Sequence, residues 1–394
     1  MGRVVLCVQN MPVPRDPRVW NEARSLAAAG HIVTVVSPRG PGQRRHERLD
    51  GVEIITFPPT PDRNGVIGQA LETGNALAWT LWHCLRLRLG ARIDVLHGAN
   101  PPDTFFVVAL VLRLFGTRFV YDQHDLAPEL ASVRWGDRYP VLKLMRFLER
   151  RSYRAASLVI TPNASYREVA LLRGALDPHR VVVVRNGPRQ SGRMAIPPPS
   201  RRPLVVSYGG VMGPQDGVEV LLRATAEIES RRPGEIKLVL IGDGRDVVRL
   251  RRLVAELRIE DVVEWTGWLD GEAYTTRLHS AHVGVSPELE DDLSLRSTMI
   301  KITEYVAGGM PAVVADLPES RVTAGEAALY FRAGDAADLA RRLEELMDRP
   351  ELLDRLAEKA LLRGPELVWA HSGEQLVAAY SELLGGEPQV AVAR

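Results

Sequence analysis

The feature that most restricts the fold is the alternation of short apolar runs with longer helical patterns along the whole chain. The runs are rich in β-branched residues and lie at 4–8, 33–37, 52–57, 94–98, 118–122, 157–161 and 181–184 in the first half, and at 203–210, 237–244, 262–267, 281–287 and 311–316 in the second. Runs of this kind predict buried strands, and the amphipathic patterns between them, such as 17–30 and 142–156, predict helices. Buried strands separated by helices predict an α/β protein with parallel sheets covered on both faces.

The length and one segment of unusual composition predict two such domains. A chain of 394 residues is longer than a domain with a single hydrophobic core usually is. The segment GPRQSGRMAIPPPSRRP, at 187–203, is rich in Pro, Gly and Arg and has no apolar periodicity. We therefore expect an N-terminal Rossmann-like domain over 1–187, a linker over 188–203, a second Rossmann-like domain over 204–365, and a C-terminal segment over 366–394. The amphipathic part of that last segment, 366–384, is expected to be a helix that crosses back to the first domain, or one that packs only on its own domain.

Composition excludes several classes of protein. Hydrophobic residues make up 45% and charged residues 25%, which is ordinary for a globular chain and excludes disordered and fibrous proteins. The two cysteines, Cys7 and Cys84, lie in apolar patterns and are interpreted as buried thiols rather than a disulfide or a metal site. The apolar stretch VVLCV near the amino terminus is too short for a signal peptide, and no run reaches the ~18 residues of a membrane span. We expect a cytoplasmic protein, at most in contact with the inner face of the cell membrane, and no nucleic-acid partner.

The net charge of +1 conceals two oppositely charged halves. Residues 1–200 contain 27 Lys and Arg against 16 Asp and Glu, whereas the remainder contains 23 against 33. Either the two domains simply face each other, or the basic half meets an anionic acceptor or an anionic membrane surface. The segment LKLMRFLERRSYRAA at 142–156 has a basic amphipathic pattern, which is typical of a packed helix with a solvated face and also of peripheral membrane contact.

In folds of this type ligands bind at the carboxyl ends of the strands, and here two domains would face each other across a cleft. In the second domain these strand ends carry glycines at 209, 210, 242 and 244, whose backbone amides can approach a phosphate or sugar because no Cβ intervenes. The candidate donor-binding residues at these ends are Gly209, Gly210, Val211, Met212, Gly242, Asp243, Gly244, Trp268 and Leu269.

The stretch LRSTMIKITEYVAGG, at 295–309, places four polar side chains within two turns of an apolar helix. Ser297 and Thr298 are good N-cap residues, so the amide end of the helix is expected to point into the cleft and suit a diphosphate. Lys301 would add a charge to the phosphates, and Glu304 would accept hydrogen bonds from a ribose diol. Since the two are three residues apart, an intrahelical ion pair on a solvated face is the alternative.

Polar side chains also follow the predicted strands of the first domain. His124, Asp125 and Glu129 follow the strand at 118–122, and His97 and Asn100 end or follow the strand at 94–98. Burying such a cluster of polar side chains costs free energy, which favours a functional role for it. The remaining candidate acceptor contacts are Asp16 and Arg18 near the start of the first helix, where solvated loop charge is the alternative, and Asn186, which with Gly187 would otherwise act as a hinge.

Seven segments in this order resemble the retaining glycosyltransferases of family 4, also called glycosyltransferase group 1. They are DPRVWNEARSLAAAGHIVTVVS, DVLHGANPP, YDQHDLAPE, VVRNG, GVMGPQDGVEVLLRA, IGDG and STMIKITEYVAGGMPAVV, spanning about residues 4–384 with their surroundings. The resemblance implies the GT-B fold and is nearest to the branch that adds N-acetylated amino sugars in cell-surface polysaccharide assembly. It implies transfer of an N-acetylhexosamine or related hexose from a UDP-linked donor to a hydroxyl acceptor. The basic first half would suit an anionic acceptor, and the basic segment at 142–156 would suit a lipid-linked one.

The resemblance assigns roles to two side chains and shows departures at three positions. Glu304 matches the second glutamate of a paired motif, which contacts the donor ribose, and His124 matches the histidine that contacts the transferred sugar. The first glutamate of the pair falls at Arg296, and the family's arginine and lysine for the diphosphate fall at Val211 and Asp216. Arg296 lies near Lys301 and is interpreted as a bidentate substitute for the missing charge, the alternative being an exposed arginine beside Asp291 and Asp292.

We accordingly expect His124, Arg296, Lys301 and Glu304 to be the catalytic residues, with stabilisation of the leaving diphosphate as the main catalytic effect. No carboxylate occupies an obvious nucleophile position, which agrees with attack by the acceptor on the face from which the diphosphate departs. No cofactor and no metal are expected, since the acidic run at 290–292 resembles surface charge. Two alternatives remain: a nucleotide-sugar 2-epimerase of the same fold, and a non-catalytic nucleotide-binding partner of another transferase.

Overall fold

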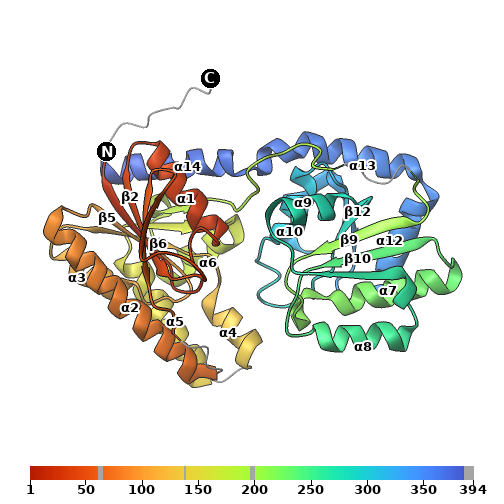
Figure 1. Ribbon diagram of the computed structural model, residues 1–394, viewed down its shortest axis with the longest axis horizontal. Helices are drawn as coiled ribbons and strands as arrows, with labels where there is room; N and C mark the ends of the chain where they lie inside the picture. The colour runs from red at the N-terminus through yellow and green to blue at the C-terminus, as the bar shows by residue number, and fades with distance from the viewer. Residues whose placement is uncertain (61–64, 137–138, 196–199, 386–394) are drawn as a thin grey trace. The chain divides into compact units, whose positions relative to one another are not determined.

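The computed structural model describes residues 1–60, 65–136, 139–195 and 200–385 (Figure 1). The chain forms two compact units, one consisting of Met1–Arg185 together with the residues from Ala370 onward, the other of Asn186–Trp369. The expected linker at 188–203 therefore groups with the second unit. Residues 196–199 of that linker and 386–394 of the expected tail lie outside the described residues.

The first unit contains an eight-stranded sheet with the order β3-β4-β2-β1-β5-β6-β7-β8. Its strands are β1 (Arg3–Cys7), β2 (Ile32–Pro38), β3 (His46–Leu49), β4 (Val52–Phe57), β5 (Val95–Ala99), β6 (Arg118–Asp122), β7 (Leu158–Thr161) and β8 (Val181–Val183). All neighbouring strands are parallel except β3 and β4, which form an antiparallel pair at the edge. The order reverses at β1, so the chain turns from one side of the sheet to the other at the ends of β1 and β5.

Helices cover this sheet on both faces, as expected for buried parallel strands. They are α1 (Pro17–Ala28), α2 (Gly65–Gly90), α3 (Phe106–Arg113), α4 (Ala127–Trp135), α5 (Tyr139–Ala155), α6 (Ala164–Gly174) and α14 (Trp369–Leu384), with a 3-10 turn at Pro178–Arg180. The helices α2, α3 and α5 lie together on one side of the sheet (Figure 1), where they share one apolar core with the strands. Cys7 and Cys84 are both buried as free thiols in that core, as expected.

Helix α1 illustrates how the sequence sets the entry to the site. Asp16 is its N-cap, since a carboxylate oxygen of Asp16 accepts a hydrogen bond of 3.0 Å from the amide of Val19. Pro17 follows at the first helical position, where its missing amide costs nothing. The helix then buries Trp20 and Leu26, and it buries Arg18 as well. The first turn of α1 is thus fixed at the carboxyl end of β1.

The second unit contains a six-stranded parallel sheet with the order β11-β10-β9-β12-β13-β14. Its strands are β9 (Leu204–Gly209), β10 (Ile236–Ile241), β11 (Val263–Gly267), β12 (Val283–Ser286), β13 (Ala312–Ala315) and β14 (Ala328–Phe331). Its helices are α7 (Val218–Arg231), α8 (Val247–Leu257), α9 (Gly271–His279), α10 (Ile300–Ala307), α11 (Pro318–Ala324), α12 (Ala336–Asp348) and α13 (Pro350–Arg363). Short 3-10 turns occur at Pro214–Asp216, Glu260–Val262, Gly325–Ala327 and Gly364–Leu367.

The predicted α/β class with two parallel-sheet domains is confirmed. Every run interpreted as a strand contains one, but two strands were missed. His46–Leu49 is mostly exposed at the sheet edge and has no apolar run, and Ala328–Phe331 is only four residues long. No helix of the described residues is long and apolar enough to cross a membrane.

Candidate active site

The second unit brings the predicted donor residues of α10 together with the carboxyl end of β9. Lys301 is buried, and its amine is paired with the carboxylate of Glu288 and lies 3.9 Å from that of Asp216. The amine also lies 4.8 Å from the centre of the Tyr208 ring. Burial alone would lower the pKa of Lys301, but the carboxylate of Glu288 outweighs burial and raises this pKa well above its ordinary value. Lys301 is therefore a fixed positive charge beneath the end of β9.

Glu304 lies one turn further along α10 and has a different partner. One of its carboxylate oxygens accepts a hydrogen bond of 2.8 Å from the hydroxyl of Tyr274, on α9. Burial raises the pKa of Glu304 to about 7, against the opposing effects of Tyr274 and Lys301. The alternative of an intrahelical ion pair on a solvated face is wrong, since Lys301 pairs with Glu288 instead.

The glycines at the strand ends allow two turns to pack against each other. Gly242 has φ +135°, and a Cβ there would lie 1.9 Å from the carbonyl oxygen of Gly210. A Cβ on Gly210 would lie 3.3 Å from Cε of Lys301. All four glycine amides already donate hydrogen bonds within the unit: Gly209 to the Tyr305 hydroxyl, Gly210 to the Ile241 carbonyl, Gly242 to the Gly267 carbonyl and Gly244 to the Asp243 carboxylate. The glycines therefore allow close packing of the backbone, and their contact with a phosphate or sugar stays a prediction.

The expected N-cap residues of α10 are also corrected. The helix begins at Ile300 with Met299 as its N-cap, and no side chain caps it. The hydroxyl of Ser297 donates to the carbonyl of Leu293 at 2.8 Å, and that of Thr298 donates to the carboxylate of Glu319 at 3.2 Å. A turn over 293–297 thus uses Ser297 before the helix starts.

The other predicted donor residues line the ends of β9, β10 and β11. Val211 and Trp268 are 55% and 59% exposed, and the Trp268 indole donates to Asp270 at 2.8 Å. Met212 is buried, Leu269 is half-buried against the core around α10, and Asp243 is exposed. Arg296 is 38% exposed and contacts Asp292, its guanidinium donating to that residue's carbonyl at 2.6 Å. This is the contact that the alternative described, and a diphosphate role for Arg296 stays a prediction.

The first unit contains a buried ionic cluster at the ends of β1, β5 and β6. Arg18 donates to both carboxylate oxygens of Asp122, at 2.8 and 3.3 Å, and to the carbonyl of Val184 at 2.9 Å. Its guanidinium also lies 3.1 Å from the carboxylate of Glu22. Burial opposes the ionisation of Asp122, but Arg18 and His124 outweigh it and hold the pKa of Asp122 well below its usual range. Because these groups are buried together, each depends on the others for its charge.

Two histidines complete the cluster. Nε2 of His97 lies 3.3 Å from Asp122 and 3.4 Å from Glu22, and Nδ1 lies 2.7 Å from the hydroxyl of Tyr380, on α14. Burial would lower the pKa of His97, but the two carboxylates raise it to about 9. Nε2 of His124 is hydrogen-bonded to Asp122. The side chain of His124 is 15% exposed, whereas that of His97 is fully buried. Of the two, only His124 is accessible to a substrate.

Asn100 holds the backbone that carries His124. Its side-chain oxygen accepts hydrogen bonds from the amides of His124, at 2.6 Å, and Asp125, at 3.0 Å. Its amide nitrogen donates to Asp103 at 2.9 Å and to the hydroxyl of Tyr121 at 3.1 Å. Asn100 therefore acts within the unit as a positioning residue for the turn after β6.

The remaining predicted acceptor contacts are less well placed. Asp16 is the N-cap of α1, and its surface is 8% exposed. Burial raises the pKa of Asp125. Glu129 is paired with Arg173, which also contacts the buried Glu149, so its side chain supports the packing of α4, α5 and α6. Asn186 is the first residue of the second unit. These contacts do not test whether Asp16, Asp125, Glu129 and Asn186 bind the acceptor, so that role stays a prediction for all four.

Sequence reasoning missed several residues of these clusters. Asp122 and Tyr121 lie in the same quoted segment as His124, and Glu288 directly follows the run at 281–287, so attention to the polar residues beside each predicted strand end would have found them. Glu22 is four residues after Arg18, the spacing of a helical ion pair. Tyr274 and Tyr380 carry no local signal, because their partners are distant in the sequence.

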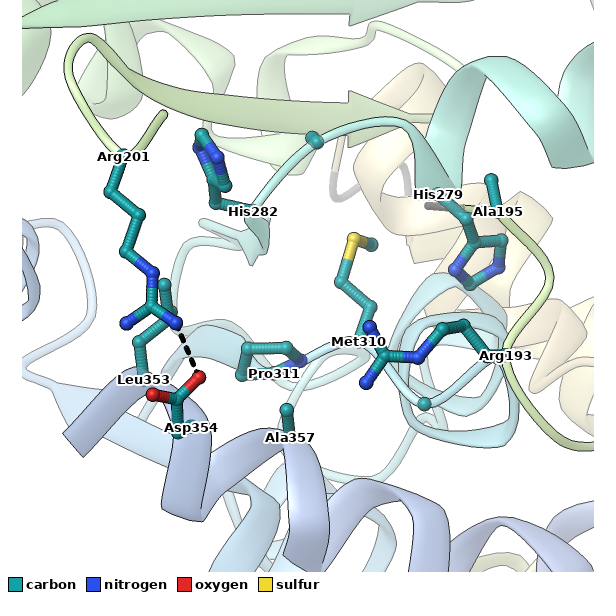
Figure 2. Close-up of a pocket in the computed structure, with 13 residues that line it drawn as sticks. Arg193, Ala195, Arg201, His279, His282, Met310, Pro311, Leu353, Asp354 and Ala357 are labelled. Carbon is teal, nitrogen blue, oxygen red and sulfur yellow. Dashed lines mark hydrogen bonds and ion pairs between the residues drawn. The ribbon is translucent and has the colours of Figure 1, made fainter. Parts of the chain in front are cut away.

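A separate pocket of about 240 Å³ lies at the amino ends of β12 and β13, opposite the strand ends that carry the predicted donor residues (Figure 2). Arg201 and Asp354 are paired at 2.5 Å on one edge, and Arg193 lies beside His279 on the other. Burial lowers the pKa of His279 to about 4, so its ring is neutral at pH 7. No predicted donor residue lines this pocket, and ligands of parallel sheets bind at the opposite strand ends.

Glu22, Asp122 and His124 are close enough together to hold a metal ion. The guanidinium of Arg18 already contacts both carboxylates, and a divalent cation would have to displace it. These residues therefore fit an internal ion cluster better than a metal site.

Known proteins resemble this chain in sequence and in fold. Residues 16–187 match the family described as "Glycosyl transferase 4-like domain", and residues 202–349 match the family described as "Glycosyl transferases group 1". The chain is 28% identical to MMP alpha-(1->4)-mannosyltransferase of Mycolicibacterium hassiacum, over 92% of this chain and 93% of that protein. It is also 28% identical to 2-deoxystreptamine N-acetyl-D-glucosaminyltransferase of Streptomyces fradiae, over 91% of this chain and 93% of the relative. The structure of Anabaena HepE in complex with UDP-glucose is similar with a TM-score of 0.72 and 16% identity, over 97% of this chain and all of the other.

The two family matches together span most of the chain and follow the two units. The chain therefore belongs to the glycosyltransferases of group 1, which have the GT-B fold. It is a glycosyltransferase.

Proposed function

We propose that the protein transfers an N-acetylhexosamine or a related hexose from a UDP-linked donor to a hydroxyl acceptor, with retention of configuration. The observation that carries the proposal is the arrangement of Lys301 and Glu304 on one helix beside the packed turns after β9 and β10. A fixed cation and a carboxylate one turn apart suit a diphosphate and the ribose diol next to it. The N-acetylglucosaminyl activity in one relative's name and the UDP-glucose bound by HepE support this donor class.

In this mechanism the bond between C1 of the sugar and the diphosphate oxygen breaks, and a bond from C1 to the acceptor oxygen forms on the same face. The proton of the acceptor hydroxyl passes to the departing diphosphate. Lys301 stabilises the charge that develops on the diphosphate, as does the amino end of α10. The resemblance assigns His124 to the transferred sugar, and Asp122 and Asn100 fix the position of its ring and backbone.

The cation for the diphosphate has an unusual origin in this chain. The resemblance places a lysine at position 216, but here Asp216 faces the amine of Lys301 at 3.9 Å. The positive charge is therefore delivered from α10 instead of the turn after β9. Glu288 holds Lys301 in the absence of donor, so donor binding has to compete with this ion pair. We propose that Lys301 provides the catalytic cation, that Arg296 adds a second one, and that no metal is needed.

The test combines binding and turnover. Thermal unfolding is measured with UDP, GDP, dTDP and their sugars, because a ligand of the folded state raises the melting temperature. We expect stabilisation by one UDP-hexosamine that is lost in Glu304→Ala and retained in Glu256→Ala, which changes an exposed, distant glutamate on α8. No stabilisation by any nucleotide sugar would overturn the proposed donor site.

Turnover then separates the alternatives. Released UDP that depends on a hydroxyl acceptor, with the anomeric configuration retained by NMR and rates unchanged in EDTA, would support the proposal. A product formed without acceptor would indicate the epimerase. Nucleotide binding without any turnover would indicate a non-catalytic partner of another transferase.

A further inference from the structure

The first unit exposes an unusual concentration of apolar side chains on three neighbouring helices, α2, α3 and α5. Eleven of the 22 large apolar side chains that are exposed in the described part of the chain lie on these helices or directly after α3, each with 36% to 91% of its surface exposed. They are Ile67, Leu71, Trp82, Leu85, Leu89, Val107, Leu110, Leu114, Phe115, Leu144 and Phe147. These segments form about a seventh of the described residues, so the exposed apolar residues are concentrated there rather than scattered.

The spacing of these residues gives each helix one exposed apolar stripe. On α2 the residues 67, 71, 82, 85 and 89 are separated by steps of three, four and eleven residues, which return to the same face of a helix. On α3 and its C-cap the residues 107, 110 and 114 are separated by three and four residues. The opposite sides of α2 and α3 pack into the core of the unit through residues such as Cys84 and Leu112. These two helices therefore have one apolar side that faces the core and a second apolar side that faces solvent.

The same three helices carry eight Lys or Arg against two Glu. The cations are Arg86, Arg88, Arg113, Lys143, Arg146, Arg150, Arg151 and Arg154. Of the two acids, Glu149 is buried and paired with Arg173, which leaves only Glu72. Among the described residues no carboxylate lies within ion-pair distance of any of the eight cations, and the contact recorded for Arg88 is with the ring of Phe115, at 5.3 Å from the ring centre.

We propose that the exposed face of α2, α3 and α5 binds the surface of an anionic phospholipid bilayer. Unpaired cations gain free energy near anionic headgroups, and apolar side chains interspersed with them gain free energy by entering the headgroup region. Neither contribution alone holds a protein firmly on a membrane, but this face offers both.

Two other occupants fit the face less well. A second copy of the chain, bound through the same face by a two-fold axis, would bring two sets of unpaired cations together and repel. A nucleic acid would satisfy the cations but would leave the exposed Leu and Phe side chains of α5 without a partner. Charge and apolar exposure together therefore select a lipid surface.

The experiment measures partition of the full-length protein onto vesicles by co-sedimentation. One set is pure phosphatidylcholine and the other contains about 30% phosphatidylglycerol, and we expect at least tenfold stronger partition onto the anionic set. About 0.5 M NaCl should reduce this partition strongly, because the Debye length falls to a few ångströms. Equal partition onto both sets, or none onto either, would overturn the proposal.

Two pairs of substitutions test the location of the surface. Arg146→Glu with Arg150→Glu reverses two exposed cations on α5 and should weaken partition by about tenfold or more. Its control is Arg252→Glu with Arg355→Glu, which makes the same change in net charge on exposed helices of the second unit and should leave partition nearly unchanged. Equal loss in both pairs would mean that net charge alone attracts the protein, and would overturn the assignment to α5.

The apolar part has its own pair of variants. Leu144→Ser with Phe147→Ser removes two side chains that are 55% and 56% exposed, and partition onto anionic vesicles should fall severalfold. The control is Val248→Ser with Leu362→Ser, which are 67% and 73% exposed in the second unit. All variants should keep the thermal stability and donor binding of the unaltered protein, so a failure of the membrane proposal is separate from a failure of the proposed function. Vesicle-independent dimerisation that the same α5 variants abolish would contradict the proposal in favour of a second copy.

Discussion

On the helices of the second unit most arginines contact a carboxylate, whereas the arginines on α2, α5 and the end of α3 in the first unit have no recorded carboxylate partner in the described chain. The second-unit pairs include Arg223 with Glu219, Arg231 with Glu227, Arg249 with Asp246, Arg321 with Asp316 and Arg349 with Glu345. This difference agrees with the opposite charges of the two halves of the sequence, because carboxylates outnumber cations only in the second half. A surface cation can therefore be either neutralised by a carboxylate of the same chain or left available to an external anion.

The buried charges of the two units differ in another way. The first unit buries a cluster of Arg18 with two acids and two histidines, and the second buries Lys301 with Glu288. The larger cluster joins α1, β5, β6 and α14, so it connects distant parts of the chain. The smaller one holds a single cation at the proposed donor site. We therefore expect the first cluster to dominate stability and the second to dominate donor binding.

The largest expected effect comes from removing the cation of the first cluster. Arg18→Met leaves Asp122 and Glu22 buried without their guanidinium, which typically costs about 3–5 kcal/mol. The calorimetric melting temperature of the first unit should fall by about 6–20 °C. Arg252→Met, at an exposed position on α8, is the control and should change it little. A shift as small as that of the control would contradict the expectation that the first cluster dominates stability.

The next effect is a dependence of stability on pH that arises from His97. The pKa of this histidine is about 9 in the folded protein against an ordinary value of 6.5, so its contribution to stability is full below pH 6.5 and is lost as the pH rises through 9. The free energy of unfolding should decrease by up to about 3 kcal/mol across this window.

Denaturant unfolding at the two ends of the window measures this decrease. His97→Gln should flatten the dependence, whereas His371→Gln, which alters an exposed histidine of α14, should not. An unaltered slope in His97→Gln would show that the charge of His97 does not stabilise the cluster.

The sequence predicted the parts of this molecule that depend on local pattern. Parallel strands buried on both faces follow from runs such as VVLCV, and the polar residues after each run marked the ends where sites form. The sequence did not predict the partners of these residues, because Lys301 meets Glu288 and Glu304 meets Tyr274 only after strands and helices pack. Ser297 failed as a predicted N-cap since its hydroxyl serves the preceding turn, a choice that the local sequence does not determine.

A smaller effect is expected on donor affinity in the second unit. The pKa of Glu304 is about 7, so its carboxylate form is present above that pH and lost below it. In the proposed function this form accepts hydrogen bonds from the ribose. Lowering the pH from about 8 to about 6 should weaken binding of the UDP-sugar about tenfold, in proportion to the ionised fraction. Titration calorimetry should use the sugar nucleotide, because the terminal phosphate of free UDP itself titrates near pH ~6.

Glu304→Gln is the matched variant for that measurement. Its amide cannot ionise, so donor affinity should be weak and independent of pH over the same interval. A dependence that persists in Glu304→Gln would assign the titration to another group and would remove the ribose role from Glu304.

The smallest effect concerns the surface pairs of the second unit. Arg231 contacts Glu227 at 2.6 Å and Glu344 at 3.0 Å, and its side chain is 43% exposed. Exposed pairs of this kind contribute about 1 kcal/mol or less, because water screens them and the long side chains lose entropy. Arg231→Ala should therefore lower the free energy of unfolding by less than about 1 kcal/mol. Arg150→Ala, on the unpaired face of α5, should have no measurable effect on it.

A double-mutant cycle with Glu344→Ala isolates the pair from other consequences of Arg231→Ala. A coupling above about 2 kcal/mol would mean that the second unit depends on its surface pairs for stability, and the two units would then differ in how they fold. A coupling below about 1 kcal/mol would leave the surface arginines of both units unimportant for stability. The difference between them would then lie in their partners: carboxylates of the same unit neutralise the arginines of the second unit, whereas the first unit's cations remain available for an anionic partner.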